Sequence, residues 1–159
     1  MSSIITHNIN QKTYAKLGEI VLRWAEADGF LGNSINWVSG FAPESAEAKN
    51  VYKLRMEEKI KSLKKRCRTR NDVATLLQDI QQVMKRRRAE RHAIAHGTAL
   101  KTEDGAIVLR SDKGYEFRID DVNDALAQAR YISDLAIRLN LNLAAPWTKN
   151  LFPTLERPD

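Results

Sequence analysis

Arg91, His92 and His96 are the residues whose types and spacing could do chemistry in this chain. They lie in the segment Lys85–Gly97, KRRRAERHAIAHG, which holds two of the three histidines of the protein. Histidine suits proton transfer because its unperturbed pKa lies near neutral pH. Arginine suits a phosphate group because its planar guanidinium offers paired, permanently charged donors. The segment therefore contains the groups that cleavage of RNA without a metal ion requires.

The residues before this segment predict that it is the end of a helix. Apolar side chains recur there every three or four residues, as on one face of a helix. Continued forward, that face reaches Arg87 and Arg91, and an arginine on a core-facing stripe must find a partner, solvent or an interface. His92 and His96 are four residues apart and share one side of the helix. The apolar positions of this face are Val73, Leu76, Leu77, Ile80, Val83 and Met84.

The spacing of Arg91 and His96 leads us to expect a homodimer. Five residues place the two side chains about 140° apart around a helix. They converge only if Arg91 reaches along the helix or if a second subunit contributes. A two-fold dimer that pairs this helix with itself would bring two such sets into one groove.

Three further helices and one hairpin are predicted around this segment. The first helix runs from about residue 10 to 28, with Trp24 on its apolar, core-facing side, and closes at Gly29. Residues 31–43 are predicted to form a loop. Trp37, Val38 and Phe41 in this loop are apolar enough to pack on the bundle or on a partner chain. The second helix starts near Pro43 and runs to about residue 68. Residues 106–109 and 115–119 predict a β-hairpin. The last helix opens at 120–121. An irregular tail begins at about residue 144, and we expect Trp147, Leu151 and Phe152 in it to dock against another surface. The expected fold is therefore all-α, a four-helix up-down bundle with a small β-hairpin inserted between helices 3 and 4. The buried face of the last helix is predicted at Val122, Leu126, Ala129, Ile132, Ser133, Ala136 and Leu139.

Two basic runs suggest contact with nucleic acid. The net charge of +6 is a mild bias toward anionic partners. One run ends the second predicted helix and the other ends the third, and each can equally be a solvated helix face. The candidate phosphate ligands are Lys64, Lys65, Arg66, Lys85, Arg86, Arg87 and Arg88.

Length and composition are those of one soluble globular domain covering residues 1–159. Hydrophobic residues make up 43% and charged residues 29% of the 159 residues. Cys67 is the one cysteine, which excludes an internal disulfide and fits a reducing cytoplasm. The start of the chain lacks the features of a signal peptide, and no stretch approaches the ~18 apolar residues of a membrane span. We expect a cytoplasmic protein without a membrane segment.

The motif Arg91-His92-Ala93-Ile94-Ala95-His96-Gly97 resembles the signature of the HEPN superfamily, in which an arginine is followed by four to six residues and a histidine. The order of helices around the motif extends the resemblance over most of the chain. The resemblance implies a small helical bundle that is typically dimeric. Many members are metal-independent ribonucleases of toxin–antitoxin, phage-defence or RNA-processing systems, and toxin-like members often have a neutralising partner protein.

Carried over to this chain, the resemblance makes Arg91 and His96 the catalytic pair. His92 occupies a polar position at which the family commonly has asparagine, so this chain departs from the usual pattern there. Some family members only bind nucleotides or have lost catalysis. A nucleotide-binding or nucleic-acid-binding protein is therefore the alternative to a nuclease. For either function the expected partner is RNA or a nucleotide.

Two other interpretations of the histidines remain. They can be capping and hydrogen-bonding groups at a basic helix end, in a purely structural helical dimer. Histidines four apart can also share zinc, but no further ligands occur at a recognisable spacing. The chain also lacks a glycine-rich phosphate loop and a nucleophile elbow. We expect no metal and no cofactor, and we expect Glu90 to be a local ion-pair partner of Arg91.

Overall fold

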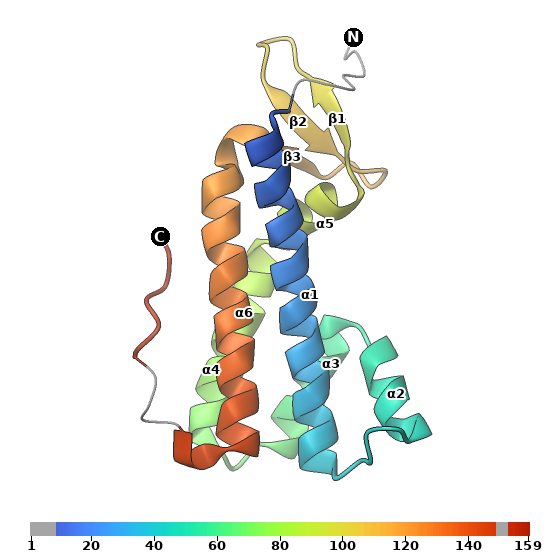
Figure 1. The fold of residues 1–159 in the computed structure, drawn as a ribbon, viewed down its shortest axis with the longest axis vertical. Helices are drawn as coiled ribbons and strands as arrows, with labels where there is room; N and C mark the ends of the chain where they lie inside the picture. The colour runs from blue at the N-terminus through green and yellow to red at the C-terminus, as the bar shows by residue number, and fades with distance from the viewer. Residues whose placement is uncertain (1–8, 149–152) are drawn as a thin grey trace.

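The computed structural model describes residues 9–148 and 153–159. Within these residues, six α-helices form an elongated body with a three-stranded antiparallel sheet at one end (Figure 1). The predominance of helix is confirmed. Two short 3-10 turns, Ile119–Asp121 and Pro146–Thr148, flank the last helix. The elements are α1 (Gln11–Ser39), α2 (Ala46–Lys53), α3 (Met56–Arg66), α4 (Asn71–Arg86), α5 (Arg88–His96), β1 (Thr98–Lys101), β2 (Ile107–Arg110), β3 (Glu116–Arg118) and α6 (Val122–Ala144).

The two longest helices, α1 and α6, lie side by side and run in the same direction (Figure 1). Near their starts, the Lys16 ammonium donates to the Asn123 side chain at 2.6 Å. Near their ends, the Asn140 amide donates to the Ser34 hydroxyl at 3.2 Å. In an up-down bundle of four helices the first and last helices are antiparallel, so the predicted up-down order is corrected.

The cause of this difference is that the second predicted helix divides into α2 and α3. Leu54 and Arg55 are both extended, and the Glu58 carboxylate accepts a hydrogen bond from the Arg55 backbone N–H at 2.8 Å at the start of α3. A carboxylate at this position satisfies a backbone donor that the helix itself leaves free. The break adds one reversal of the chain, and an additional reversal makes the final helix parallel to the first.

Helix α1 also continues ten residues beyond its predicted end at Gly29, through most of the predicted loop. Leu31 and Ile35 carry its buried face forward. At Gly32, a Cβ atom would lie 2.9 Å from Cδ1 of Tyr52, so the glycine permits close packing of α2 on α1. The helix ends instead at Gly40, which is left-handed with φ of 66°.

The predicted hairpin is formed by β2 and β3, in a register that pairs Leu109 with Phe117. Both side chains are buried and join the core shared with the helices. The prediction missed β1, which pairs with the other edge of β2 so that Thr98 lies opposite Arg110. Helix α5 ends immediately before β1, so the sheet fixes the end of α5 that carries His96.

The buried face of α6 is confirmed at all seven predicted positions. The tail was predicted to dock Trp147, Leu151 and Phe152. Trp147 is instead 77% exposed, and Leu151 and Phe152 lie outside the described residues. The end of the chain does return to α6, where the Gln128 side chain donates to the backbone oxygen of Pro158 at 3.2 Å.

None of the helices in the described ranges combines the length and the apolar character needed to cross a membrane. Cys67 is buried, and this burial raises the pKa of its thiol. A raised pKa is the opposite of what activates a cysteine as a nucleophile.

Candidate functional site: a cavity between α1, α3 and α5

Helix α5 begins at a break in the predicted third helix. Arg87 donates its N–H to the Val83 oxygen and accepts from the Arg91 N–H, so the backbone stays helix-like across the break. Its φ of −104° and ψ of 10° nevertheless leave it outside both helices. Helix α5 is therefore a separate helix from α4. Of its nine residues, only Ala93 is buried.

The Arg87 side chain attaches this break to α6. Its guanidinium lies 2.7 Å from the Asp124 carboxylate and 3.0 Å from that of Glu90. Glu90 was expected to pair with Arg91, and this is corrected, because Arg87 is its partner. Burial raises the pKa of the Glu90 carboxyl, and the nearby Arg87 charge opposes that rise. Arg87 is thus compensated within its own chain.

Arg91 points from α5 toward α1. Its guanidinium carbon lies 5.4 Å from the centre of the Trp24 ring, in a cation–π contact. One of its nitrogens lies 3.9 Å from the sulfur of Met56, at the start of α3. Arg91 therefore finds neighbours from two other helices of the same chain, although none of these neighbours is an anion.

His92 and His96 lie on one side of α5, as predicted. Their ring centres are 5.0 Å apart, with the planes at 61°. The His92 ring also contacts the ring of Tyr115, with the two ring centres 5.3 Å apart. This contact joins α5 to the segment before β3. The Nδ1 atom of His92 is buried without a hydrogen-bond partner, whereas His96 is exposed. Among the described residues, no group of three or more potential metal ligands occurs.

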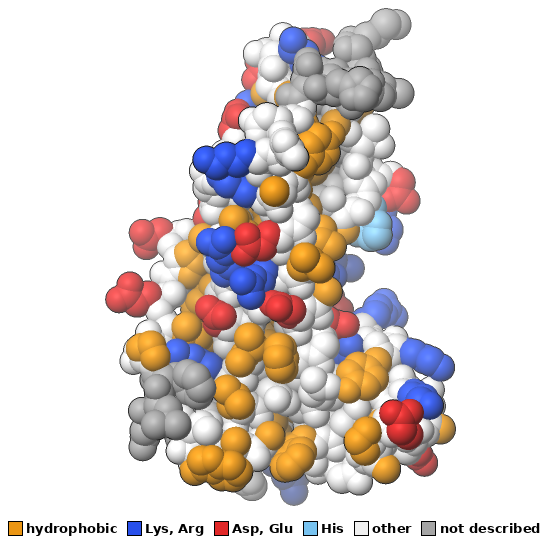
Figure 2. All heavy atoms as spheres, in the orientation of Figure 1, with side chains coloured by type: hydrophobic (Ala, Val, Ile, Leu, Met, Phe, Trp, Pro, Cys, Tyr) orange, Lys and Arg blue, Asp and Glu red, His pale blue; other side chains and the backbone are white. Residues whose placement is uncertain are grey.

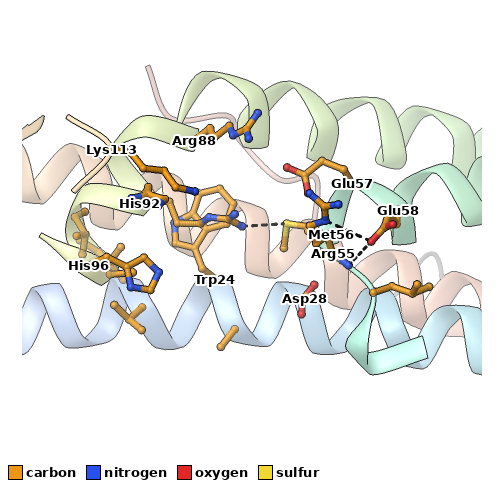
Figure 3. A pocket seen from close by; sticks show the side chains of 17 residues that line it. Trp24, Asp28, Arg55, Met56, Glu57, Glu58, Arg88, His92, His96 and Lys113 are labelled. Carbon is orange, nitrogen blue, oxygen red and sulfur yellow. Dashed lines mark hydrogen bonds and ion pairs between the residues drawn. The ribbon is translucent and has the colours of Figure 1, made fainter. Parts of the chain in front are cut away.

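These side chains open into one cavity of about 610 Å³ between α1, α3 and α5. Figure 2 shows the molecule hollowed on its right side, with a histidine and basic side chains around the hollow. In Figure 3, His92, His96 and Arg88 project from α5, opposite Trp24 and Asp28 of α1. The cavity is lined by Ile20, Val21, Trp24, Ala25, Asp28, Leu54, Arg55, Met56, Glu57, Glu58, Arg88, Arg91, His92, Ile94, Ala95, His96 and Lys113.

The structure thus brings together four of the ten residues predicted for the site: Arg88, Arg91, His92 and His96. Because Arg91 and His96 line the same cavity, one chain is enough to bring them into one site. Lys85 and Arg86 are exposed at the end of α4, outside the cavity lining. Lys64, Lys65 and Arg66 end α3, and Lys64 donates to Gln81. These five basic residues do not line the cavity, and neither does Arg87.

Sequence reasoning missed the residues that other elements contribute. The periodicity of the first helix assigns Trp24 to its core stripe, and that assignment is correct, since Trp24 is 5% exposed. Its ring nevertheless forms part of the cavity wall. The sequence marks Lys113 only as a turn residue and Arg55 only as part of a helix. Charge alone was the available signal for both, and it does not distinguish them from other surface cations.

Three of the four lysine and arginine side chains that line this cavity have no anionic partner among the described residues, and the fourth, Arg55, pairs with Glu58. Arg23, Arg55, Arg70, Arg87, Arg110, Arg118 and Arg130 each pair with a carboxylate. Within the described part of the chain, no carboxylate pairs with Arg88, Arg91 or Lys113. Three uncompensated cations beside two histidines form a site suited to an anion such as a phosphate group.

Comparison with known proteins adds no relative: no family model, no curated protein and no solved structure matches this chain.

Proposed function

We propose that this protein is a metal-independent endoribonuclease of the HEPN type, with its active site in the cavity between α1, α3 and α5. One observation carries the proposal. Two imidazoles lie 5.0 Å apart in a cavity that also contains Arg88, Arg91 and Lys113, none of them paired with a carboxylate in the described residues.

The reaction is attack of a ribose 2′-oxygen on the adjacent phosphorus. The new P–O2′ bond closes a 2′,3′-cyclic phosphate, the P–O5′ bond breaks, and the released chain keeps a 5′-hydroxyl. One group must accept the 2′-hydroxyl proton and another must give a proton to the leaving oxygen. We assign these two transfers to His96 and His92, the two histidines in the cavity lining.

Arg91 and Arg88 are assigned to the phosphate. Negative charge grows on the phosphate oxygens in the transition state, and a guanidinium can donate two hydrogen bonds to them without reorganisation. Trp24 packs against the Arg91 guanidinium and limits the positions it can adopt. The tryptophan is in this sense a positioning residue for Arg91.

The direct test is to incubate the purified protein with single-stranded and structured RNA in EDTA. Cleavage should continue without divalent ions and should leave 2′,3′-cyclic phosphate and 5′-hydroxyl ends. A broad panel of RNAs left intact would overturn the proposal. In that case salt-sensitive RNA binding would favour the second candidate, a non-catalytic nucleotide-binding or nucleic-acid-binding protein, because that function needs only the unpaired cations.

We further propose that the protein acts as a homodimer. The spacing of Arg91 and His96 no longer motivates this proposal, because both residues line one cavity within a single chain. Its support is an exposed apolar stripe on α1, made of Tyr14, Val21 and Leu22. Hydrophobic side chains are visible over α1 in Figure 2. Val21 lines both the candidate site and a neighbouring apolar cavity of about 390 Å³. Sedimentation at micromolar concentration should give a dimer, and a monomer would contradict it.

A further inference from the structure

The cavity has two chemically different ends. His92, His96 and Lys113 lie toward one end, Asp28, Arg55, Glu57 and Glu58 lie toward the other, and Arg88 lies between them (Figure 3). The proposed reaction uses the cationic end only. The acidic end repels phosphate, so it must face a part of the ligand that carries hydrogen-bond donors.

Two carboxylates at this end have free acceptor capacity. Asp28 uses Oδ2 to hold the Lys59 ammonium at 2.7 Å, while its Oδ1 atom is buried and accepts no hydrogen bond. In the described residues, the Glu57 carboxylate also has no hydrogen-bond or ion-pair partner. Glu58 is occupied, because it accepts from the Arg55 backbone and pairs with its side chain.

Trp24 adds an unused donor to the same wall. It is 5% exposed, and its Nε1 atom is buried without a partner. Trp24 and Asp28 are four residues apart on α1, so they share one helix face, and both reach the cavity. A buried polar atom without a partner costs free energy unless a ligand or water satisfies it. This wall therefore carries a buried donor and a buried acceptor that the described residues leave without partners, and Glu57 of α3 adds an acceptor.

Of the four RNA bases, guanine fits this arrangement best. Its Watson–Crick edge carries two adjacent donor groups, N1–H and the N2 amino group, followed by the O6 acceptor. An ionised carboxylate only accepts hydrogen bonds. Adenine, cytosine and uracil each place a ring or carbonyl acceptor beside their single donor group, and that acceptor would face a carboxylate.

We propose that the acidic end of the cavity is a base subsite that selects guanine next to the scissile phosphate. Asp28 and Glu57 accept from N1–H and the amino group, and Trp24 donates to O6. The volume of about 610 Å³ lies in the range of cavities that hold a ligand of nucleotide size. The inference rests on the proposed ribonuclease function, whose phosphate end fixes where the base must lie.

Calorimetric binding of nucleoside 3′-monophosphates tests the subsite without any cleavage. Guanosine 3′-phosphate should bind roughly tenfold more tightly than inosine 3′-phosphate, which lacks only the amino group, because one charge-assisted hydrogen bond is lost. Uridine 3′-phosphate should bind more weakly than either. Equal affinities for the guanosine and inosine compounds, or no binding of guanosine 3′-phosphate, would overturn the subsite.

Two exposed glutamates, Glu57 inside the cavity lining and Glu47 outside it, test which carboxylate produces the preference for guanosine over inosine. Glu57→Gln keeps an acceptor oxygen but loses the charge, so it should lower the guanosine-to-inosine ratio, whereas Glu47→Gln on α2, outside the cavity lining, should leave it unchanged. We choose Glu57 because Asp28 also holds the buried Lys59, so its replacement can disturb the fold. A ratio unchanged in Glu57→Gln would overturn the assignment.

The proposed guanine subsite and the proposed ribonuclease activity are distinguished by different outcomes. Cleavage in EDTA together with equal nucleotide affinities would keep the ribonuclease and reject the guanine subsite. A guanine preference together with intact RNA would support the subsite and reject the ribonuclease.

Discussion

Helices α4 and α5 belong to one amphipathic run in the sequence, yet the structure uses them differently. Helix α4 buries Val73, Leu77, Ile80, Val83 and Met84 against the rest of the molecule. Helix α5 continues the run, but only Ala93 is buried, and Arg88, Arg91, His92 and His96 line the cavity. Helix α4 contributes to the core, and helix α5 lines the candidate site.

The contrast depends on Arg87, which lies between the two helices. By pairing with Asp124 of α6 it anchors the break, so α5 can diverge from α4 without losing its attachment to the body. Polar groups on a core-facing stripe would be costly if the helix continued straight into the core. The break allows those positions to face a cavity instead.

The largest expected effect comes from the α4 side of the comparison. Leu77 is fully buried, so Leu77→Ala should lower the free energy of unfolding by about 2–5 kcal/mol. Ile94 of α5 is only partly buried, and Ile94→Ala should cost about half as much or less. Urea unfolding of both variants measures this. Equal losses would mean that α5 is as much a part of the core as α4.

Gly97 tests how firmly the end of α5 is fixed. A Cβ atom there would lie 2.2 Å from the Ala93 oxygen and 3.0 Å from the Leu109 Cβ. Gly97→Ala should therefore cost about 1–3 kcal/mol through overpacking. A Cβ atom added at Gly29 of α1 would have nothing within 4 Å, so Gly29→Ala should instead stabilise the helix by roughly 0.5–1 kcal/mol. Thermal unfolding should give shifts of opposite sign, and shifts of the same sign would contradict this packing.

Arg88 should affect ligand binding rather than stability. It is exposed and has no carboxylate partner in the described residues, so Arg88→Ala should change stability by about 0.5 kcal/mol or less. RNA binding should weaken, and the slope of log affinity against log salt should fall by roughly 0.7 for a single strand. Lys12→Ala, at the exposed start of α1, is the control. If both variants weaken binding equally, Arg88 has no special place in the site.

The smallest expected effect is a pH dependence from Glu90. Because burial raises its pKa in the folded state, folding takes up a proton at pH values where the unfolded carboxyl is ionised. Its contribution to stability is therefore largest in acid and falls as pH rises from about 4.3, the ordinary glutamate value, through the raised pKa. The unfolding free energy of wild type relative to Glu90→Gln should decrease over that window. A difference that grows with pH would contradict the sign.

Much of this architecture follows from periodicity. The α4 stripe, the buried face of α6 and the β2–β3 hairpin are local patterns that the sequence predicts correctly. The predicted helix boundaries were wrong where tertiary contacts outweigh the local sequence signals for a helix end. Gly29 suggested a helix end, yet Leu31 and Ile35 pack well enough to carry α1 past it. The break at Arg87 has no glycine or proline to mark it, and its partner Asp124 is distant in the sequence.

In the candidate site too, contacts within one helix were predictable from the sequence and contacts between helices were not. His92 and His96 share one helix, so their proximity was predictable from spacing and is confirmed. The contact of Arg91 with Trp24 joins α5 to α1, and the acidic end adds residues from α3. Such groupings depend on how helices pack against one another, which helix periodicity alone does not specify.

The most direct test of the account is the rate of RNA cleavage by His96→Ala in EDTA, beside wild type. Loss of a general acid or base should slow cleavage by ~10²–10⁴-fold. Because His96 is exposed and lies at the end of α5, RNA affinity and melting temperature should stay close to those of wild type. A His96→Ala protein that cuts RNA as fast as wild type would contradict the assignment of this cavity as an active site.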